Sequence, residues 1–242
     1  MNHLAVNSPL RLLVSSILIS VILSSCSVSS KYTKEASENW EKDILKFEQR
    51  DKIEKDPSNA IFFVGSSSIR LWSTLQQDVA PYPVIQRGFG GSKFSDLSVY
   101  VKRIVYPHQF RALVIFEAND ITGSKTDKSP EEVVKLLQNI VRTVRKKYAD
   151  QPIFVLGITP TKSRWNVWPV VKRTNLLLKE SCDNLHNTYF VETAAAYLNK
   201  DGEPRNDLFL DDRLHQNHEG YIIWGDLVKK RLDEVLRKNT KQ

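Results

Sequence analysis

The chain has 242 residues, 41% of them hydrophobic, and its 35 Lys and Arg against 28 Asp and Glu give a net charge of +7. This length suits one α/β domain, and no internal repeat or second domain is visible. The basic balance does not indicate a nucleic-acid partner, because the Lys and Arg clusters within 142–147 and 229–238 fall on helical patterns with an apolar opposite face. A surface near anionic lipid or envelope polymer is the simpler expectation for these charges.

The N-terminus has the proportions of an export signal. Arg11 precedes an apolar stretch, Leu12 to Leu23, which is shorter than the roughly 20 residues of a membrane span. The stretch ends Leu23-Ser24-Ser25-Cys26, which resembles the lipobox of bacterial lipoproteins. That resemblance implies cleavage before Cys26 and a diacylglycerol on its sulfur. An ordinary signal peptide with a Cys nearby by chance is the alternative.

We therefore divide the chain into a lipoprotein signal peptide (1–25), a polar tether (26–38) and one domain (39–240). In bacterial lipoproteins, an Asp directly after the lipidated Cys often signals retention in the inner membrane. Because Ser27 follows Cys26 instead, we expect a lipid-anchored envelope protein on the outer membrane, facing the periplasm. With Cys26 lipidated, Cys182 has no disulfide partner and is expected to be a small buried hydrophobe.

Apolar strands and helical patterns alternate along the rest of the chain. Trp40, Ile44 and Phe47 have helical spacing and predict an opening helix. Continuous rather than alternating apolarity marks strands that are buried on both faces of a parallel sheet. The strand-like runs are Ile61–Val64, Val84–Ile85, Leu113–Phe116, Ile153–Leu156 and Tyr189–Val191. This alternation predicts a doubly wound α/β fold with about five parallel strands.

Two helices have clear signals. Ser129 and Pro130 are typical of a helix start, and Glu132 is placed to reach back as in a capping box. The last helix is expected after His215 and turns Trp224 and other apolar residues inward.

A candidate nucleophile follows the first strand. Ser67 lies in Gly65-Ser66-Ser67-Ser68, at a tight strand-to-helix turn that would expose its hydroxyl. Because free serine needs a base, we assign His215 as the base and Asp212 as the residue that orients its ring. A glycine turn with a serine helix cap is the alternative for the first motif.

Acyl transfer also needs donors directed at the oxygen that becomes negative. The candidates are the backbone N–H of Ser67, the backbone of Gly91 in Arg87-Gly88-Phe89-Gly90-Gly91, and the side-chain amide of Asn119 in Ala118-Asn119-Asp120. Taken singly, the last two could also be a glycine turn and an Asn cap.

Taken in order, these blocks resemble the SGNH, or GDSL-type, serine hydrolases, whose Ser, Gly, Asn and His match Ser67, Gly91, Asn119 and His215. The similarity runs from about Trp40 to Leu236. It implies a flavodoxin-like three-layer α/β/α fold and hydrolysis of esters or thioesters without a metal or cofactor. The segments most similar to the branch of platelet-activating-factor acetylhydrolase-like proteins are Ile69–Trp72, Arg87–Gly91, Ser163–Trp165 and Glu219–Tyr221.

The chain departs from the family pattern at two positions. Ser66 stands where the family usually has Asp, a supporting residue, so activity is expected to survive. Glu117 stands where the family usually has Gly. Its carboxylate is expected either to lie at the cleft edge and repel anionic substrates, or to point outward.

Four residues near the motifs are candidate substrate contacts, because Trp suits sugar rings or acyl chains and Arg suits carboxylate or phosphate. Packing of a loop onto the domain is the alternative for all of them. The four are Arg70, Trp72, Arg164 and Trp165.

The leading hypothesis is therefore a lipid-anchored esterase for short acyl esters of a carbohydrate or lipid carrier. A lysophospholipase or thioesterase, a non-catalytic envelope-binding module, and a metal site remain alternatives. The metal site would use Asp211, Asp212, His215 and His218.

Overall fold

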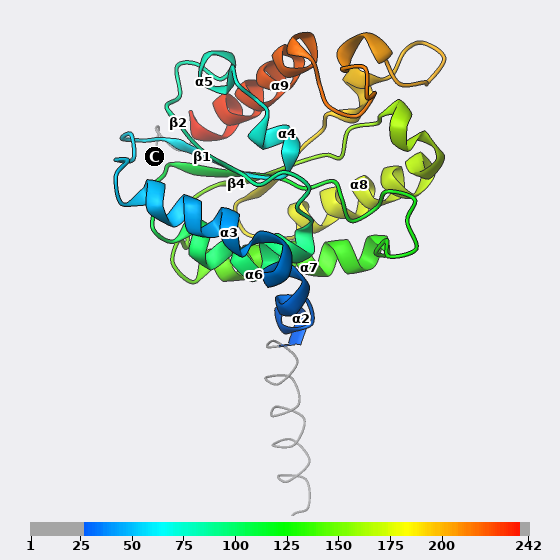
Figure 1. The fold of residues 1–242 in the computed structure, drawn as a ribbon. Coiled ribbons are helices and arrows are strands. Elements are labelled where there is room, and N and C mark those ends of the chain that lie inside the picture. Colours follow the sequence, from blue (N-terminus) through cyan, green and yellow to red (C-terminus); the bar gives the residue numbers. More distant parts are fainter. Residues whose placement is uncertain (1–26, 238–242) are drawn as a thin grey trace, which may run out of the picture.

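The computed structural model describes residues 27–237. They form three layers, with a parallel sheet between two layers of helices (Figure 1). The sheet has the order β2-β1-β3-β4-β5, and every neighbouring pair is parallel. The strands are β1 (Ile61–Gly65), β2 (Val84–Gly88), β3 (Ala112–Phe116), β4 (Ile153–Leu156) and β5 (Thr188–Val191). The five strands and the α/β class expected from the sequence are confirmed.

Helices cover both faces of this sheet. One face packs against α3 (Thr33–Asp51), α6 (Phe94–Val105), α7 (Pro130–Arg145) and α8 (Trp168–Asp183). The other packs against α4 (Ser67–Arg70), α5 (Leu75–Asp78) and α9 (His218–Leu236). The remaining helical segments are α2 (Ser27–Ser30), η2 (Lys162–Val167), η3 (Ala194–Tyr197) and η4 (Asn206–Leu208).

Strand side chains divide between these two layers in alternation. In β1, Phe62 and Val64 join the core under α3 and α6, whereas Ile61 and Phe63 join the core under α9. All four are fully buried. Helices cover both faces of the sheet, and this explains why the strand sequences are continuous apolar runs rather than alternating ones.

The register brings three strand ends to one edge. Gly65, the last residue of β1, lies opposite Gly88 in β2 and Phe116 in β3. A Cβ at Gly65 would lie 1.9 Å from the Phe116 carbonyl oxygen, and its φ is +148°. Only glycine fits here, so the chain can turn at once from β1 into the loop that carries Ser67.

The segment expected as a polar tether is instead helical and packed. Tyr32 and Ala36 are buried, and with Trp40, Ile44 and Phe47 they continue one helical stripe along α3. The expectation of a free tether over 26–38 is therefore wrong from residue 27 onward. Cys26 and the expected signal peptide lie outside the described residues.

Side chains on α7 hold the N-terminal segment in place. Ser129 caps α7 by accepting from the Glu132 amide at 3.2 Å, as expected. Glu132 does not reach back to its own helix start; its carboxylate accepts from Lys31 at 2.7 Å and from the Tyr32 hydroxyl. Asn139 donates to the Ser29 hydroxyl at 2.8 Å. Within 27–237, no helix combines the length and apolarity needed to cross a bilayer.

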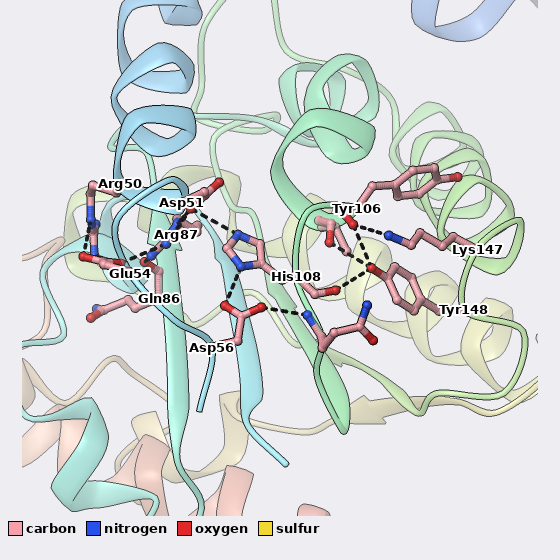
Figure 2. A network of polar contacts seen from close by, with 12 residues as sticks. Arg50, Asp51, Glu54, Asp56, Gln86, Arg87, Tyr106, His108, Lys147 and Tyr148 are labelled. Carbon is pink, nitrogen blue, oxygen red and sulfur yellow. Dashed lines mark hydrogen bonds and ion pairs between the residues drawn. The ribbon is translucent and has the colours of Figure 1, made fainter. Parts of the chain in front are cut away.

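A buried ionic network fixes the far end of α3 to the sheet (Figure 2). Arg87 in β2 is 2% exposed and donates to Asp51 at 2.6 Å and to Glu54 at 3.0 Å. His108 lies between Asp51, at 3.3 Å from its Nε2, and Asp56, at 2.8 Å from its Nδ1. Arg87 therefore directs its charge toward α3, although it opens the Arg87–Gly91 motif.

Candidate active site

Ser67, His215 and Asp212 form a continuous series of hydrogen bonds. Ser67 is the first residue of α4, and its Oγ lies 3.0 Å from His215 Nε2. The other ring nitrogen, Nδ1, lies 2.6 Å from Asp212 Oδ2. A nucleophile, a base and a residue orienting the base need this order of contacts.

A tight turn presents Asp212 to the imidazole. Asp212 Oδ1 accepts from the amides of Leu214 and His215, each at 2.9 Å. Arg213, which follows Asp212, has φ +54°, and the turn closes through a hydrogen bond from the Leu210 amide to the His215 carbonyl at 2.8 Å. Burial opposes ionisation of Asp212, but the His215 side chain and these amides outweigh it and lower the pKa of Asp212. Its carboxylate is thus ready to stabilise a charged imidazole.

A small pocket opens beside Ser67 and His215. Its volume is about 40 Å³, whereas on this measure a single water needs roughly 10–15 Å³. It therefore accommodates only a few non-hydrogen atoms. Its wall is mostly apolar and includes Phe116, Ile121, Ile158, Trp168, Val171 and Leu214.

Asn119 lines the same pocket and is held at both ends of its amide. Its Nδ2 donates to the Ser92 carbonyl at 2.8 Å, and its Oδ1 accepts from Arg164 Nη2 at 2.7 Å. An amide nitrogen carries two hydrogens, so one remains for a substrate oxygen.

Arg164 therefore acts on the loop that carries Asn119. In addition to Asn119, its guanidinium donates to the Ala118 carbonyl at 2.8 Å. Burial lowers the pKa of Arg164 from its usual value. Arg164 lines the pocket, but its Nη1 and Nη2 groups already serve this loop.

Two backbone donors accompany Asn119. Within 27–237, neither the N–H of Ser67 nor that of Gly91 has a hydrogen-bond acceptor. Gly91 has φ +98° and does not line the small pocket. Ser66, the replacement for the family's Asp, is buried, and its amide donates to the Phe116 carbonyl at 3.0 Å.

Glu117 lies neither at the cleft edge nor on the outside, so both expectations for it are wrong. It is 0% exposed beneath the Asn119 loop, and the Ser92 hydroxyl donates to its carboxyl group, with 2.9 and 3.1 Å to the two oxygens. Burial, reinforced by Asp120 and Asp96, raises the pKa of Glu117 well above its usual value against the effect of Ser92. A neutral Glu117 would not repel an anionic substrate.

The other expected substrate contacts have different surroundings. Trp72 is fully buried, is stacked on Tyr221 with ring centroids 5.4 Å apart, and donates to Asp78 at 2.6 Å. It belongs to the core under α9, so the expectation that it contacts substrate is wrong. Trp165 does not line the pocket but stacks on Trp168, which does. Arg70 lies outside this pocket, in a neighbouring groove.

The loop after β4 supplies pocket residues that sequence reasoning did not select. Thr159, Pro160 and Thr161 line the pocket, and Thr159 accepts from the Trp224 indole at 3.2 Å. Their position after a strand end was a usable signal, because parallel strands direct their carboxyl ends to one edge. Trp168 had no comparable signal.

The residues considered for a metal site do not converge. Asp211 and His218 are exposed, and His218 is the first residue of α9. Asp212 is instead engaged by His215 and the turn amides. In the part of the chain that the structure describes, no three His, Cys, Asp or Glu side chains are grouped to hold a metal ion.

Similar folds occur in several known structures. A Streptococcus pneumonia protein provisionally described as a platelet activating factor has a TM-score of 0.70 at 19% identity, covering 89% of this chain and 99% of that one. A provisionally described acylhydrolase from Bacteroides fragilis has a TM-score of 0.67 at 18% identity, covering 79% of this chain and 96% of that one. A catalytic mutant of an acetylxylan esterase from Geobacillus stearothermophilus has a TM-score of 0.59 at 16% identity, covering 74% of this chain and 96% of that one. At these identities the likeness concerns the fold.

The family follows from the sequence itself. No curated protein matches the chain significantly. Residues 63–223 match the GDSL-like lipase/acylhydrolase family, and this range contains Ser67, Asn119, Asp212 and His215. The chain therefore belongs to the GDSL-like lipase/acylhydrolase family of carboxylic ester hydrolases.

Proposed function

We propose that this protein is a lipid-anchored esterase that hydrolyses short acyl esters through Ser67, His215 and Asp212. The observation that carries the proposal is the 3.0 Å contact between Ser67 Oγ and His215 Nε2, two residues that line a small, mostly apolar pocket. The known catalytic mutants of the acetylxylan esterase change a Ser, an Asp and a His, the last two separated in sequence as Asp212 and His215 are. That agreement supports the assignment.

The reaction proceeds in two halves. Ser67 Oγ attacks the ester carbonyl carbon while His215 Nε2 takes its proton, and Asp212 stabilises the resulting imidazolium. The carbonyl oxygen becomes negative and accepts from Asn119 and from the N–H groups of Ser67 and Gly91. Collapse releases the alcohol, which takes the proton from His215, and leaves an acyl group on Ser67.

Water then completes the cycle. His215 removes a proton from a water molecule, whose oxygen attacks the acyl carbon, and Ser67 leaves with that proton as the carboxylic acid is released. No step needs a metal ion or cofactor.

The size of the pocket supports a short acyl group. About 40 Å³ suits an acetyl or similar group better than a long chain. The acetylxylan esterase has the same fold, which makes an acylated carbohydrate the preferred carrier over a long-chain lipid.

The membrane anchor is the second part of the proposal. Its support is the segment Leu12–Cys26, which has the order of a bacterial lipoprotein signal. An acylated Cys26 would hold the domain at the envelope, with the outer membrane facing the periplasm as the proposed site. Labelling of the full chain with radioactive fatty acid, compared with Cys26→Ser, tests it; equal labelling of both proteins would contradict the anchor.

The catalytic assignment is tested with the full chain in detergent. We expect hydrolysis of p-nitrophenyl acetate to exceed that of the octanoate, and Ser67→Ala to abolish both without changing the thermal unfolding midpoint. Ser73→Ala, which changes an exposed serine outside the pocket, is the matched control and should retain activity. Equal activity of Ser67→Ala and the unaltered protein would contradict the assignment.

A further inference from the structure

A second hollow lies next to the small pocket and shares helix α4 with it. Ser67 and Ser68 at the start of α4 line the pocket, whereas Arg70 at its end lines the second hollow. This hollow, the α3 groove, has a volume of about 440 Å³. One face of α3 forms a wall, with Trp40, Asp43, Phe47 and Arg50 at helical spacing.

The α3 groove reaches the proposed oxyanion loop. Its floor includes Phe89 and Gly90, which directly precede Gly91. A Cβ at Gly91 would lie 3.3 Å from the Trp40 ring, so the ring edge borders that glycine. A substrate with its carbonyl oxygen at Gly91 would therefore have neighbouring atoms at the entrance of the groove.

Arg70 is the unpaired cation of this groove. Lys46 pairs with Asp43 at 2.7 Å, and Arg50 pairs with Glu54 at 3.0 Å. Arg70 is exposed and, within residues 27–237, has no carboxylate at ion-pair distance.

The glycines of the loop give Arg70 its position. A Cβ at Gly90 would lie 2.5 Å from Arg70 Nε and 2.8 Å from Nη2, so the guanidinium lies directly on this backbone. Packing on the main chain, rather than an ion pair, therefore places the charge. Guanidinium groups bind carboxylate and phosphate through paired hydrogen bonds.

We propose that the α3 groove binds the alcohol portion of the ester and that Arg70 pairs with a carboxylate or phosphate on it. This inference rests on the proposed function, because it assigns the acyl group to the small pocket and the carrier to the groove. The preferred substrate is then a short acyl ester of an anionic carrier.

Two pairs of acetyl esters test the inference. One pair is 4-acetoxybenzoate and the neutral 4-acetoxybenzamide; the other is acetylglycerol 3-phosphate and the neutral acetylglycerol. We expect kcat/KM to favour the anionic member by about ten-fold in at least one pair, chiefly through KM. The pair that shows the preference distinguishes carboxylate from phosphate.

Arg70→Gln should remove that preference while leaving the neutral esters within about two-fold of the unaltered protein. Lys42→Gln is the matched control, since it removes one charge from an exposed position on α3 outside the groove and should retain the preference. No anionic preference in the unaltered protein, or an undiminished one in Arg70→Gln, would overturn the inference.

A binding measurement separates this result from failure of the proposed function. If all four esters resist hydrolysis, the esterase assignment fails, and calorimetric titration with 4-hydroxybenzoate and glycerol 3-phosphate still tests the groove. Binding of either anion that is lost in Arg70→Gln supports the inference; no binding, or binding unaffected by Arg70→Gln, overturns it.

Discussion

The guanidinium of Arg164 donates to the side-chain oxygen of Asn119 at 2.7 Å, and this contact helps to fix which end of the amide faces the pocket. With Oδ1 held by Arg164, Nδ2 is left to donate to Ser92 and to a substrate oxygen. Arg164 is thus a positioning residue for the proposed oxyanion hole.

Replacing Arg164 tests this role. Arg164→Met keeps much of the packing volume but frees the amide to rotate, so we expect kcat for p-nitrophenyl acetate to fall about ten-fold with KM nearly unchanged. The loss should stay below the roughly 100- to 1,000-fold typical of removing an oxyanion donor. Arg173→Met on the exposed side of α8 is the control. An effect on KM alone would mean that Arg164 contacts substrate instead.

Glu117 predicts an unusual dependence of stability on pH. Because its pKa is raised in the folded state, the folded protein keeps a proton that the unfolded chain releases above about pH 4.3. Glu117 therefore lowers the free energy of unfolding as pH rises from that value toward the folded pKa, by at most about 1.4 kcal/mol per pH unit.

Glu117→Gln removes this titration while its amide oxygen still accepts from Ser92. Urea unfolding should show the variant gaining stability relative to the unaltered protein as the pH is raised above about 4.3. Glu38→Gln, at an exposed position, should show no such divergence. Parallel curves for Glu117→Gln and the unaltered protein would mean that Glu117 is ionised in the folded state.

Arg87 is expected to matter for stability rather than turnover. Arg87→Met leaves Asp51, with a side chain only 9% exposed, without its closest cation, and should lower the free energy of unfolding by about 3 kcal/mol. The comparison is Arg103→Met, whose half-exposed pairs with Glu41 and Glu48 should cost about 1 kcal/mol or less. Similar losses for both variants in urea unfolding would argue against a special role of the network in Figure 2.

Trp168 is expected to limit acyl length. Trp168→Ala enlarges the pocket, so the ratio of kcat/KM for butyrate to acetate esters should rise by about ten-fold. Trp165→Ala is the matched control, because Trp165 stacks on Trp168 without lining the pocket. An unchanged ratio in Trp168→Ala would place the acyl group elsewhere.

The sheet and the residues around Ser67 were readable from sequence because each depends on local signals. A strand buried on both faces is a continuous apolar run, and loops after such runs meet at one edge whichever helices follow. Ser67, Asn119 and His215 accordingly lie around one pocket.

Residues whose partners come from distant parts of the chain were misread. Trp72 was expected to contact substrate, but Tyr221 and Trp224 of α9 pack against it. Glu117 was expected at the cleft edge or on the outside, because nothing near it in sequence reveals that burial favours its neutral form against the hydrogen bond from Ser92. The segment before Trp40 looked polar, since within residues 29–39 only Tyr32 and Ala36 are buried.

Under the proposed lipid anchor, the packing of that segment would set how far the enzyme reaches from the membrane. A free chain over 26–38 would have allowed about 40 Å of excursion. With α2 and α3 folded onto the domain from Ser27, an acylated Cys26 would have almost no slack behind it. The active site would then stay within about one domain diameter of the bilayer, and only esters that approach the lipid surface would reach it.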